Sequence, residues 1–381
     1  MGMACRASVD DAAPSTGPMS MDMGGTYGGS MCDLEVSCDS DGWTSGVVRG
    51  ARIKYNDPRR LSLRRRGVLN WEPGKPLTVL IIKKICNEPA TAAMLALAGW
   101  LRARGLTVLA EPTVCAAPGM GGFVPLTAES KSTVDLCITL GGDGTVLHLA
   151  SLFESDDPMP PVMSFSMGTL GFLTPFDVTD YPSLLERVLD GPQAHVTLHS
   201  RMHCELHQGG KLKVSHTVLN EAVIDRGAYS GATMLELFID DAYVTTVEAD
   251  GLIIATPSGS TAYSMSAGGS LIAPSVPCTI ISPIAPLSLS FRPIVIPETS
   301  IVCVRLPLYA RSNARVSFDG RKPMPLTRGS SVMLRSTENA LPMVNMSRLD
   351  TDWFEGITQK LKWNLSLRPS LRPPGEDHPR P

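Results

Sequence analysis

The chain has 381 residues, of which 43% are hydrophobic, and its formal net charge is -3 at pH 7. This length and apolar content suffice for two hydrophobic cores, and the charge balance excludes a broad electrostatic field for nucleic acid or an anionic membrane. The nine cysteines include no CxxC pair, and the seven histidines show no metal-ligand spacing. This pattern argues against a disulfide framework and a structural metal site, and it favours reduced thiols.

The first 70 residues are rich in Gly, Ser, Met and Asp and lack sustained periodicity, which predicts a disordered leader over residues 1–70. The acidic residues 1–45 contain one arginine, unlike a transit peptide, and no apolar run reaches the roughly 18 residues of a membrane span. We therefore expect a cytoplasmic protein. The basic run 59–66 is interpreted as a solvated surface. Phosphorylation of Ser62 is the alternative, which mass spectrometry of protein from native cells tests.

Residues 76–190 alternate strand-like and helix-like segments. Apolar runs at 77–82, 106–110, 134–140 and 161–165 have the continuous hydrophobic character of strands that are covered on both faces. A helix-like stretch opens at Pro89 and ends near Gly105, and another begins at Asp180. Strands separated by helices predict an N-terminal, doubly wound α/β domain with a parallel sheet over residues 76–190.

After residue 191 the character changes to short β-branched segments separated by turn residues, which predict an all-β layer. These segments lie at 195–207, 213–224, 234–239, 252–256, 279–282, 301–306, 315–318 and 331–334. We therefore predict an α/β plus all-β fold, with a C-terminal β-rich, sandwich-like domain over residues 191–348 and one helix near 261–271. A closing helix at about 350–365 is expected to complete the N-terminal domain, and residues 366–381 are expected to form a loose Pro/Arg-rich tail.

The sequence Gly141-Gly142-Asp143-Gly144-Thr145 follows an apolar strand and precedes a helix-like segment. Glycines at such a turn leave backbone N–H groups free to bind phosphate at the helix N-terminus. A carboxylate in the same turn repels a passively bound phosphate, so Asp143 points to chemistry: either a metal-assisted contact, or acceptance of a proton from a hydroxyl about to be phosphorylated. The alternative is that Asp143 only caps the helix.

A second motif begins at Asp250, where an apolar strand runs into a loop of hydroxyl groups, small residues and one aromatic residue, Tyr263. This loop, residues 256–269, offers many short hydrogen-bonding groups and lets a flat ring approach the backbone. Tyr263 can stack on an adenine or a nicotinamide. The alternative interpretation is a surface loop that is merely rich in serine and threonine.

A third motif is the pair Asn220-Glu221, which interrupts an otherwise apolar strand. Adjacent side chains on a strand face opposite sides, so one of the two is expected to point inward. Burying it without a partner costs on the order of 2 kcal/mol or more, which a ligand with ribose hydroxyls would offset. An edge strand with both groups in water is the alternative. Two weaker signals remain: segment 168–173 is a candidate for bringing backbone near a ligand, and segment 318–321 equally fits a hairpin turn.

The chain has neither GxxxxGK[ST] nor GxGxxG after a strand, which argues against Walker-type NTPases and ordinary dinucleotide dehydrogenases. Taken together, its motifs closely resemble those of the NAD kinase family over roughly residues 76–365. The first motif is shared with lipid and sugar kinases, whereas the combination is specific. In chain order, the resemblance rests on Gly141-Gly142-Asp143-Gly144-Thr145, Leu170-Gly171-Phe172-Leu173-Thr174, Asn220-Glu221, Ile224-Asp225-Arg226-Gly227, Asp250-Gly251-Leu252, Thr256-Pro257-Ser258-Gly259-Ser260-Thr261-Ala262-Tyr263, Ser288-Leu289-Ser290-Phe291-Arg292-Pro293 and Phe318-Asp319-Gly320.

The resemblance implies an active site between the two domains. The implied reaction transfers the terminal phosphoryl group of ATP, with a divalent metal such as Mg²⁺, to the adenosine 2′-hydroxyl of NAD and makes NADP. It implies that Asp143 is the catalytic residue, with no protein side chain assigned as a metal ligand. The implied nucleotide-binding residues are Gly141, Gly142, Gly144, Thr145, Asn220, Glu221, Asp250, Thr261, Ala262, Tyr263 and Ser266. The expected assembly is a homodimer or homotetramer, without nucleic acid or membrane partners.

Two positions depart from the family pattern. Ser258 stands where the family usually has threonine, and Leu287 stands where a histidine often precedes the Ser-Leu-Ser-Phe-Arg-Pro motif. We therefore assign Leu287 no catalytic role. Two rival functions stay open at this point: a diacylglycerol- or sphingosine-type lipid kinase that shares the glycine turn, and a sensor that binds NADP without turnover. A lipid kinase needs an acyl pocket or a membrane-binding face, and a sensor has no use for Asp143.

Overall fold

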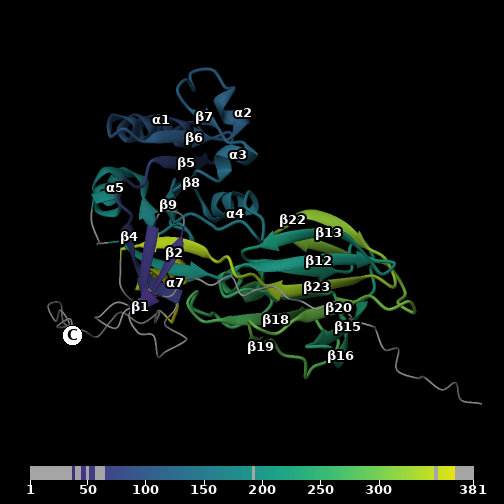
Figure 1. The fold of residues 1–381 in the computed structure, drawn as a ribbon. Coiled ribbons are helices and arrows are strands. Elements are labelled where there is room, and N and C mark those ends of the chain that lie inside the picture. Colours follow the sequence, from purple (N-terminus) through teal and green to yellow (C-terminus); the bar gives the residue numbers. More distant parts are fainter. Residues whose placement is uncertain are drawn as a thin grey trace, which may run out of the picture. The chain divides into compact units, whose positions relative to one another are not determined.

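The computed structural model of the chain describes residues 37–38, 44–48, 51–55, 65–190, 194–346 and 351–364 (Figure 1). By its backbone contacts the chain divides into the units Met1–Leu34 and Glu35–Pro381, and all described residues belong to the second. Ser62, and the tail expected at 366–381, lie outside the described residues. In the described part, no helix is both long enough and apolar enough to cross a membrane.

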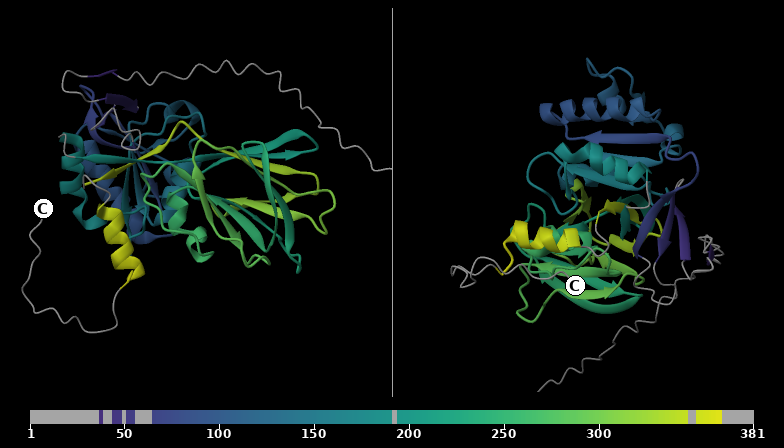
Figure 2. Two further views of the ribbon diagram at one scale, coloured as in Figure 1. Left: turned by 90° about the horizontal axis from the view of Figure 1, so that it is seen from below. Right: turned by 90° about the vertical axis from the view of Figure 1, so that its left-hand side faces the viewer.

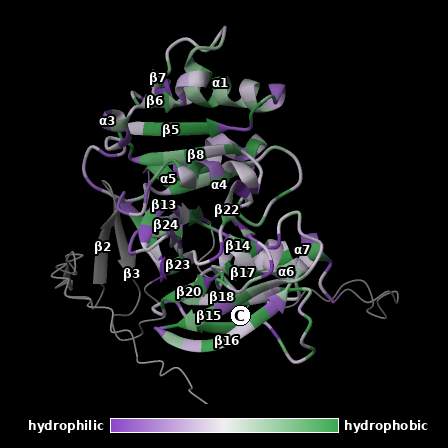
Figure 3. Cartoon of the chain, turned by 90° about the vertical axis from the view of Figure 1, so that its right-hand side faces the viewer, coloured by the Kyte–Doolittle hydropathy of each residue, from purple (hydrophilic) through white to green (hydrophobic). Residues whose placement is uncertain are grey.

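The N-terminal part contains five parallel strands in the spatial order β9-β8-β5-β6-β7. They are β5 (Thr78–Lys83), β6 (Thr107–Ala110), β7 (Val124–Pro125), β8 (Leu136–Gly141) and β9 (Val162–Ser166). Strands β5 and β8 are hydrophobic along most of their length (Figure 3). This is the composition required of a strand that is buried on both faces, and it confirms the α/β prediction for this part of the chain.

Helices cover both faces of these strands. Helices α1 (Glu88–Ala103) and α5 (Tyr181–Asp190) pack on the face that contains Val79 and Ile81. Helix α4 (Asp143–Ser151) packs on the opposite face, against Leu80 and Ile82. Shorter elements complete this region: α2 (Pro112–Cys115), α3 (Ala128–Lys131), β10 (Phe176–Asp177) and the 3-10 helix η2 (Val178–Asp180).

The same sheet continues beyond β9 with strands from both ends of the chain. Strand β24 (Leu341–Asn345) pairs parallel to β9, and β11 (His195–His199) pairs antiparallel to β24. The sheet then extends through the antiparallel strands β4 (Arg66–Trp71), β3 (Ala51–Tyr55), β2 (Thr44–Val48) and β1 (Ser37–Cys38). The prediction that residues 1–70 lack regular structure is therefore corrected for these four strands. Their backbone hydrogen bonds are completed by neighbouring strands, which composition does not reveal.

The C-terminal part consists of two six-stranded antiparallel sheets (Figure 2). One contains β12 (Met202–Gln208), β13 (Lys211–Val218), β15 (Thr233–Ile239), β16 (Ala242–Ala249), β20 (Val302–Arg305) and β23 (Ser331–Ser336). The other contains β14 (Glu221–Asp225), β17 (Gly251–Ala255), β18 (Cys278–Ile284), β19 (Ile294–Pro297), β21 (Ala314–Phe318) and β22 (Arg321–Leu326). Side chains from both sheets form one shared core, which confirms the β-rich, sandwich-like prediction.

The structure divides segments that the sequence pattern predicts as continuous. The predicted strand 195–207 is interrupted at Ser200 and Arg201, because the Arg201 side chain is fully buried and donates to the carbonyls of Phe153 (2.9 Å) and Asn339 (2.8 Å). Burial lowers the pKa of Arg201 to about 10. The helix predicted near 261–271 is shorter, comprising the 3-10 helix η3 (Ser258–Thr261) and α6 (Tyr263–Ser266).

Candidate active site

Asp143 is the first residue of α4, and its carboxylate is held by a neighbouring loop. Its Oδ2 accepts a hydrogen bond from the backbone N–H of Phe172 (3.0 Å), and its Oδ1 accepts one from the N–H of Leu173 (3.0 Å). The N-cap of α4 is Gly142, and no side chain caps the helix. The alternative interpretation, that Asp143 only caps α4, is therefore wrong. The carboxylate instead connects the glycine turn to the loop 170–174.

Two glycines make this arrangement possible. A Cβ at Gly171 would lie 1.8 Å from Asp143 Oδ1, and a Cβ at Gly141 would lie 2.0 Å from Thr145 Oγ1. Both positions therefore exclude any side chain. Gly142 and Gly144 differ, because a Cβ at either would meet nothing within 4 Å. The turn is thus packed on its inner side and open on its outer side, as a phosphate-binding turn requires.

Asn220 and Glu221 lie where β13 passes into β14, and a third residue organises their backbone. Asp319 is at the turn between β21 and β22, and its carboxylate accepts hydrogen bonds from the N–H groups of Leu219 (2.8 Å), Asn220 (2.8 Å) and Glu221 (3.1 Å). Burial raises the pKa of Asp319, and these three hydrogen bonds oppose that effect. Three amides on one carboxylate hold this stretch of backbone in a single conformation.

Both side chains of the pair are buried, whereas the sequence pattern predicted that only one would point inward. Asn220 is 7% exposed and Glu221 is 6% exposed. Asn220 Oδ1 and Glu221 Oε2 have no hydrogen-bond partner among the described residues. Burial, followed by the charge of Asp319, raises the pKa of Glu221 to about 8. Unpartnered buried oxygens are costly, so they mark a place where a polar ligand binds favourably.

The loop that contains Tyr263 packs directly on this pair. A Cβ at Gly259 would lie 2.2 Å from the carbonyl oxygen of Asn220, so only glycine allows the two backbones to meet. Thr261 ends η3, Ala262 separates η3 from α6, and Tyr263 begins α6 with 44% of its surface exposed. Ser266 ends α6 and is exposed. The structure therefore brings this predicted loop to Asn220 and Glu221.

Arg321 connects the glycine turn to the segment that contains Asn220, Glu221 and Asp319. It begins β22, two residues after Asp319, and its guanidinium donates to the carbonyl of Gly144 (2.8 Å) and lies 3.3 Å from Nδ1 of His148. The other ring nitrogen of His148 lies 2.7 Å from the Glu111 carboxylate. The motif that fitted a hairpin turn thus forms the turn and also links both halves of the site. The sequence signal for this motif is Asp319 and Arg321, an acidic and a basic residue on either side of Gly320.

Asp250 lies apart from these residues. It precedes β17, where Gly251 pairs with Asp225, whereas Glu221 pairs with Ala255 at the other end of the same strand. The two pairs are four residues apart along β14, which is about 13 Å along a strand. The Asp250 carboxylate makes an ion pair with Arg226 at 2.9 Å. The structure therefore does not bring Asp250 to the other predicted residues, and its predicted binding role stays a prediction.

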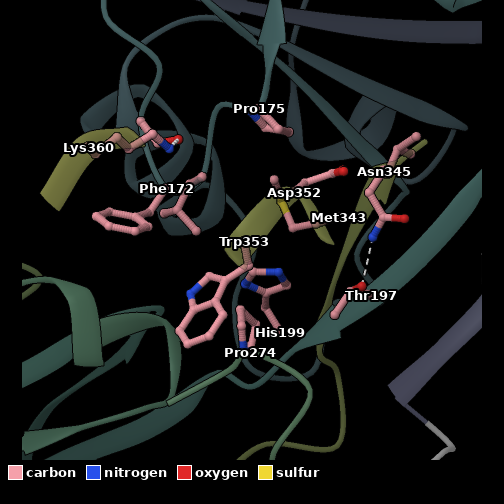
Figure 4. A pocket seen from close by; sticks show the side chains of 13 residues that line it. Phe172, Pro175, Thr197, His199, Pro274, Met343, Asn345, Asp352, Trp353 and Lys360 are labelled. Atoms are coloured by element: carbon pink, nitrogen blue, oxygen red, sulfur yellow. Dashed lines mark hydrogen bonds between the residues drawn. The ribbon is translucent and has the colours of Figure 1, made fainter. Parts of the chain in front are cut away.

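A cavity of about 50 Å³ lies behind the loop that holds Asp143. Figure 4 shows Lys360 and Phe172 together at one side of this cavity, and Thr197 and Asn345 joined by a hydrogen bond of 2.7 Å at the other. Lys360 belongs to α7 (Thr351–Leu361), and the sequence motifs did not single it out. In the described part of the chain, no group of three His, Cys, Asp or Glu side chains forms a metal cluster.

Comparison with known proteins identifies the family. The model of the ATP-NAD kinase N-terminal domain matches residues 124–193, and that of the ATP-NAD kinase C-terminal domain matches residues 219–346. NAD kinase 2, chloroplastic, of Arabidopsis thaliana is 40% identical over 79% of this chain and 32% of its own length. NADH kinase pos5, mitochondrial, of Schizosaccharomyces pombe is 36% identical over 78% of this chain and 77% of its own length. This chain therefore spans about a third of the length of the chloroplastic relative.

Solved structures agree with these matches. The crystal structure of yeast NADH kinase complexed with NADH covers 80% of this chain and 92% of its own, with 30% identity and a TM-score of 0.73. An NAD kinase from Archaeoglobus fulgidus, in complex with ATP, has the same fold with a TM-score of 0.57 and 22% identity. The class of protein is defined by two features: an α/β domain followed by a β-sandwich, and a carboxylate in a glycine-rich strand-to-helix turn. The chain belongs to the NAD kinase family.

Proposed function

We propose that this chain transfers the terminal phosphoryl group of ATP to the adenosine 2′-hydroxyl of NAD and so makes NADP. The observation that carries this proposal is the Asp143 carboxylate, which two backbone amides hold beside an open glycine turn in a chain of the NAD kinase family. Phosphoryl transfer depends mainly on positioning and charge stabilisation. A fixed carboxylate next to phosphate-binding amides supplies the positioning.

In the proposed mechanism, the backbone N–H groups of Gly142 and Gly144 and the N-terminus of α4 face the ATP phosphates. Asp143 orients the ribose hydroxyl and accepts its proton as the bond from the ribose oxygen to the terminal phosphorus forms; the bond from this phosphorus to the bridging oxygen breaks, and ADP leaves. ATP arrives with a divalent metal such as Mg²⁺, because a triphosphate offers that ion its preferred oxygen ligands. When bound, the metal would neutralise part of the negative charge of the phosphates.

The dinucleotide site is proposed at the buried oxygens of Asn220 and Glu221, with Tyr263 supplied by the loop that packs on this pair. A protonated Glu221 both donates and accepts hydrogen bonds, which suits ribose hydroxyls. Thr261, Ala262 and Ser266 complete the proposed site from the adjoining loop. A relative that is named a NADH kinase and a structure that contains NADH favour the reduced dinucleotide as a second acceptor.

A homodimer or homotetramer is proposed as the working assembly. Several large apolar side chains on the β-sandwich are exposed, among them Leu289 (86%), Tyr243 (58%) and Val295 (52%). Exposed apolar surface of this kind favours association with a second copy of the chain, which light scattering of the purified protein measures. A cytoplasmic location is also proposed. Fractionation of native cells tests it, because relatives include chloroplastic and mitochondrial forms.

One assay tests the proposed activity. The full chain is mixed with ATP, magnesium and NAD or NADH, with diacylglycerol and sphingosine as parallel acceptors, and the phosphorylated product is identified. We expect NADP or NADPH and no lipid phosphate. A phosphorylated lipid would favour the lipid kinase. Tight NADP binding without turnover would favour the sensor.

Replacing Asn220 or Glu221 with alanine is expected to raise the KM for NAD about tenfold or more, since each variant loses a hydrogen bond in a buried site. The KM for ATP should change much less, because both side chains lie at the proposed dinucleotide end. Steady-state kinetics with each substrate varied in turn measures both constants. An equal rise in the two KM values would contradict this assignment of the dinucleotide site.

Glu221→Gln is expected to stabilise the ligand-free chain at high pH. The folded pKa of Glu221 is raised from its ordinary value of 4.5 to about 8. Between these values the unfolded chain releases a proton that the folded chain retains, so the free energy of unfolding falls as pH rises through this window. Glutamine does not titrate. We therefore expect the two proteins to melt alike near pH 4, below both pKa values, and the variant to melt at the higher temperature at pH 8.5. A constant difference across this range would contradict the pKa shift.

A further inference from the structure

The peptide unit between Gly171 and Phe172 has a polar contact at each end. Its N–H donates to Asp143 Oδ2 at 3.0 Å, and its carbonyl oxygen accepts a hydrogen bond from Nζ of Lys360. A peptide unit is planar and rigid, so fixing its carbonyl also fixes the direction of its N–H. The ammonium group and the carboxylate are thus connected through one rigid group, in which each hydrogen bond strengthens the other.

Helix α7 holds Lys360 in this position. Gly356 and Ile357 are the buried residues of α7, and a Cβ at Gly356 would lie 3.6 Å from the Phe172 ring and 3.1 Å from Lys360 Nζ. The Lys360 ammonium lies 4.6 Å from the centre of the Phe172 ring, a favourable cation–π distance. Burial lowers the pKa of Lys360, and the charge of Asp143 opposes this effect.

The peptide needs this support because glycine precedes it. Gly171 must lack a side chain to accommodate Asp143, and glycine restricts its backbone less than any other residue. A rotated Gly171–Phe172 peptide would direct a carbonyl, instead of an N–H, toward the carboxylate. The contact with Lys360 opposes this rotation, because the carbonyl would then lose a charge-assisted hydrogen bond.

We propose that Lys360 is a positioning residue for phosphoryl transfer: through the Gly171–Phe172 peptide it keeps the Asp143 carboxylate in its reactive orientation. This inference rests on the proposed function of the same site. It assigns α7, near the end of the described chain, a role in the chemistry at Asp143. Lys360 acts on the carboxylate through the backbone, so its loss should affect turnover and leave substrate affinity nearly unchanged.

The test uses the full chain with Lys360→Met, Lys360→Arg and the matched control Lys362→Met. Lys362 is exposed and lies two residues further along, so its replacement removes the same charge without the contact. We expect Lys360→Met to lower kcat about 10- to 100-fold, the cost of a small misplacement of a reacting group, with both KM values within about threefold of wild type. Lys360→Arg should recover most of kcat, and Lys362→Met should match wild type.

A second measurement separates this proposal from the proposed function. Amide hydrogen exchange at Phe172 should be faster in Lys360→Met than in wild type, whether or not the chain phosphorylates NAD. If exchange at Phe172 is faster in Lys360→Met than in wild type but the wild type does not phosphorylate NAD or NADH, the proposed function alone is overturned. Unchanged exchange and unchanged kcat would overturn the role of Lys360, as would a raised KM with normal kcat. If Lys360→Met does not fold, Lys360→Gln serves in both measurements.

Discussion

Asp143→Asn is expected to lower kcat by roughly 10²-fold or more, the usual contribution of a general base. Asparagine keeps the shape of aspartate and loses the charge and the proton affinity. In this fold the carboxylate accepts one backbone N–H on each oxygen, and the amide nitrogen of asparagine would face one of those donors. The variant should therefore fold, with a loss of about 1–3 kcal/mol in the free energy of unfolding.

Kinetics and dinucleotide binding must be measured on the same preparation. The binding of NAD should persist in Asp143→Asn, because Asn220 and Glu221 are untouched. Asp156→Asn is the matched control: Asp156 is an exposed carboxylate beyond the end of α4, and it should retain wild-type turnover. Near-normal turnover in Asp143→Asn would remove Asp143 from the chemistry.

The elements that sequence predicted best are those whose hydrophobic pattern is local and continuous. The apolar runs at 77–82 and 134–140 became β5 and β8, since strands buried on both faces cannot carry polar residues. The antiparallel β2, β3 and β4 were missed. Only β4 pairs with a distant strand, β11, and β3 and β2 are joined to the sheet through β4. Long-range pairing leaves little trace in a local pattern.

In the site too, residues with a local sequence signal were predicted and residues with long-range contacts were not. The glycine turn and the Asn220-Glu221 pair were predictable, because a carboxylate among glycines and polar residues in an apolar strand are local anomalies. The segment with Asp319 and Arg321 gave only a weak signal and Lys360 gave none, since each of the three acts on backbone that is at least 98 residues away in sequence. Each of the three contacts a backbone carbonyl or N–H group, and a backbone group leaves no residue type for a sequence motif to reveal.

Gly171→Ala is expected to reduce kcat about as strongly as Asp143→Asn. The new methyl group would lie 1.8 Å from Asp143 Oδ1 and 2.6 Å from Thr174 Oγ1, so the carboxylate or the loop must move. A displacement of about 1 Å in a reacting group costs on the order of 10²-fold in rate. Overpacking of this kind should also lower the free energy of unfolding by about 1–3 kcal/mol.

Two comparisons isolate the clash from a general effect of the added methyl group. Gly99→Ala places the same methyl on the exposed surface of α1, where a Cβ meets nothing within 4 Å, and it should leave kcat unchanged while stabilising the helix by about 0.5–1 kcal/mol. In an Asp143→Ala background the oxygen that collides with the methyl is absent. The destabilisation by Gly171→Ala should then shrink by about half or more, because residues in contact do not contribute additively. Equal destabilisation in both backgrounds would mean that the methyl group does not meet the Asp143 carboxylate.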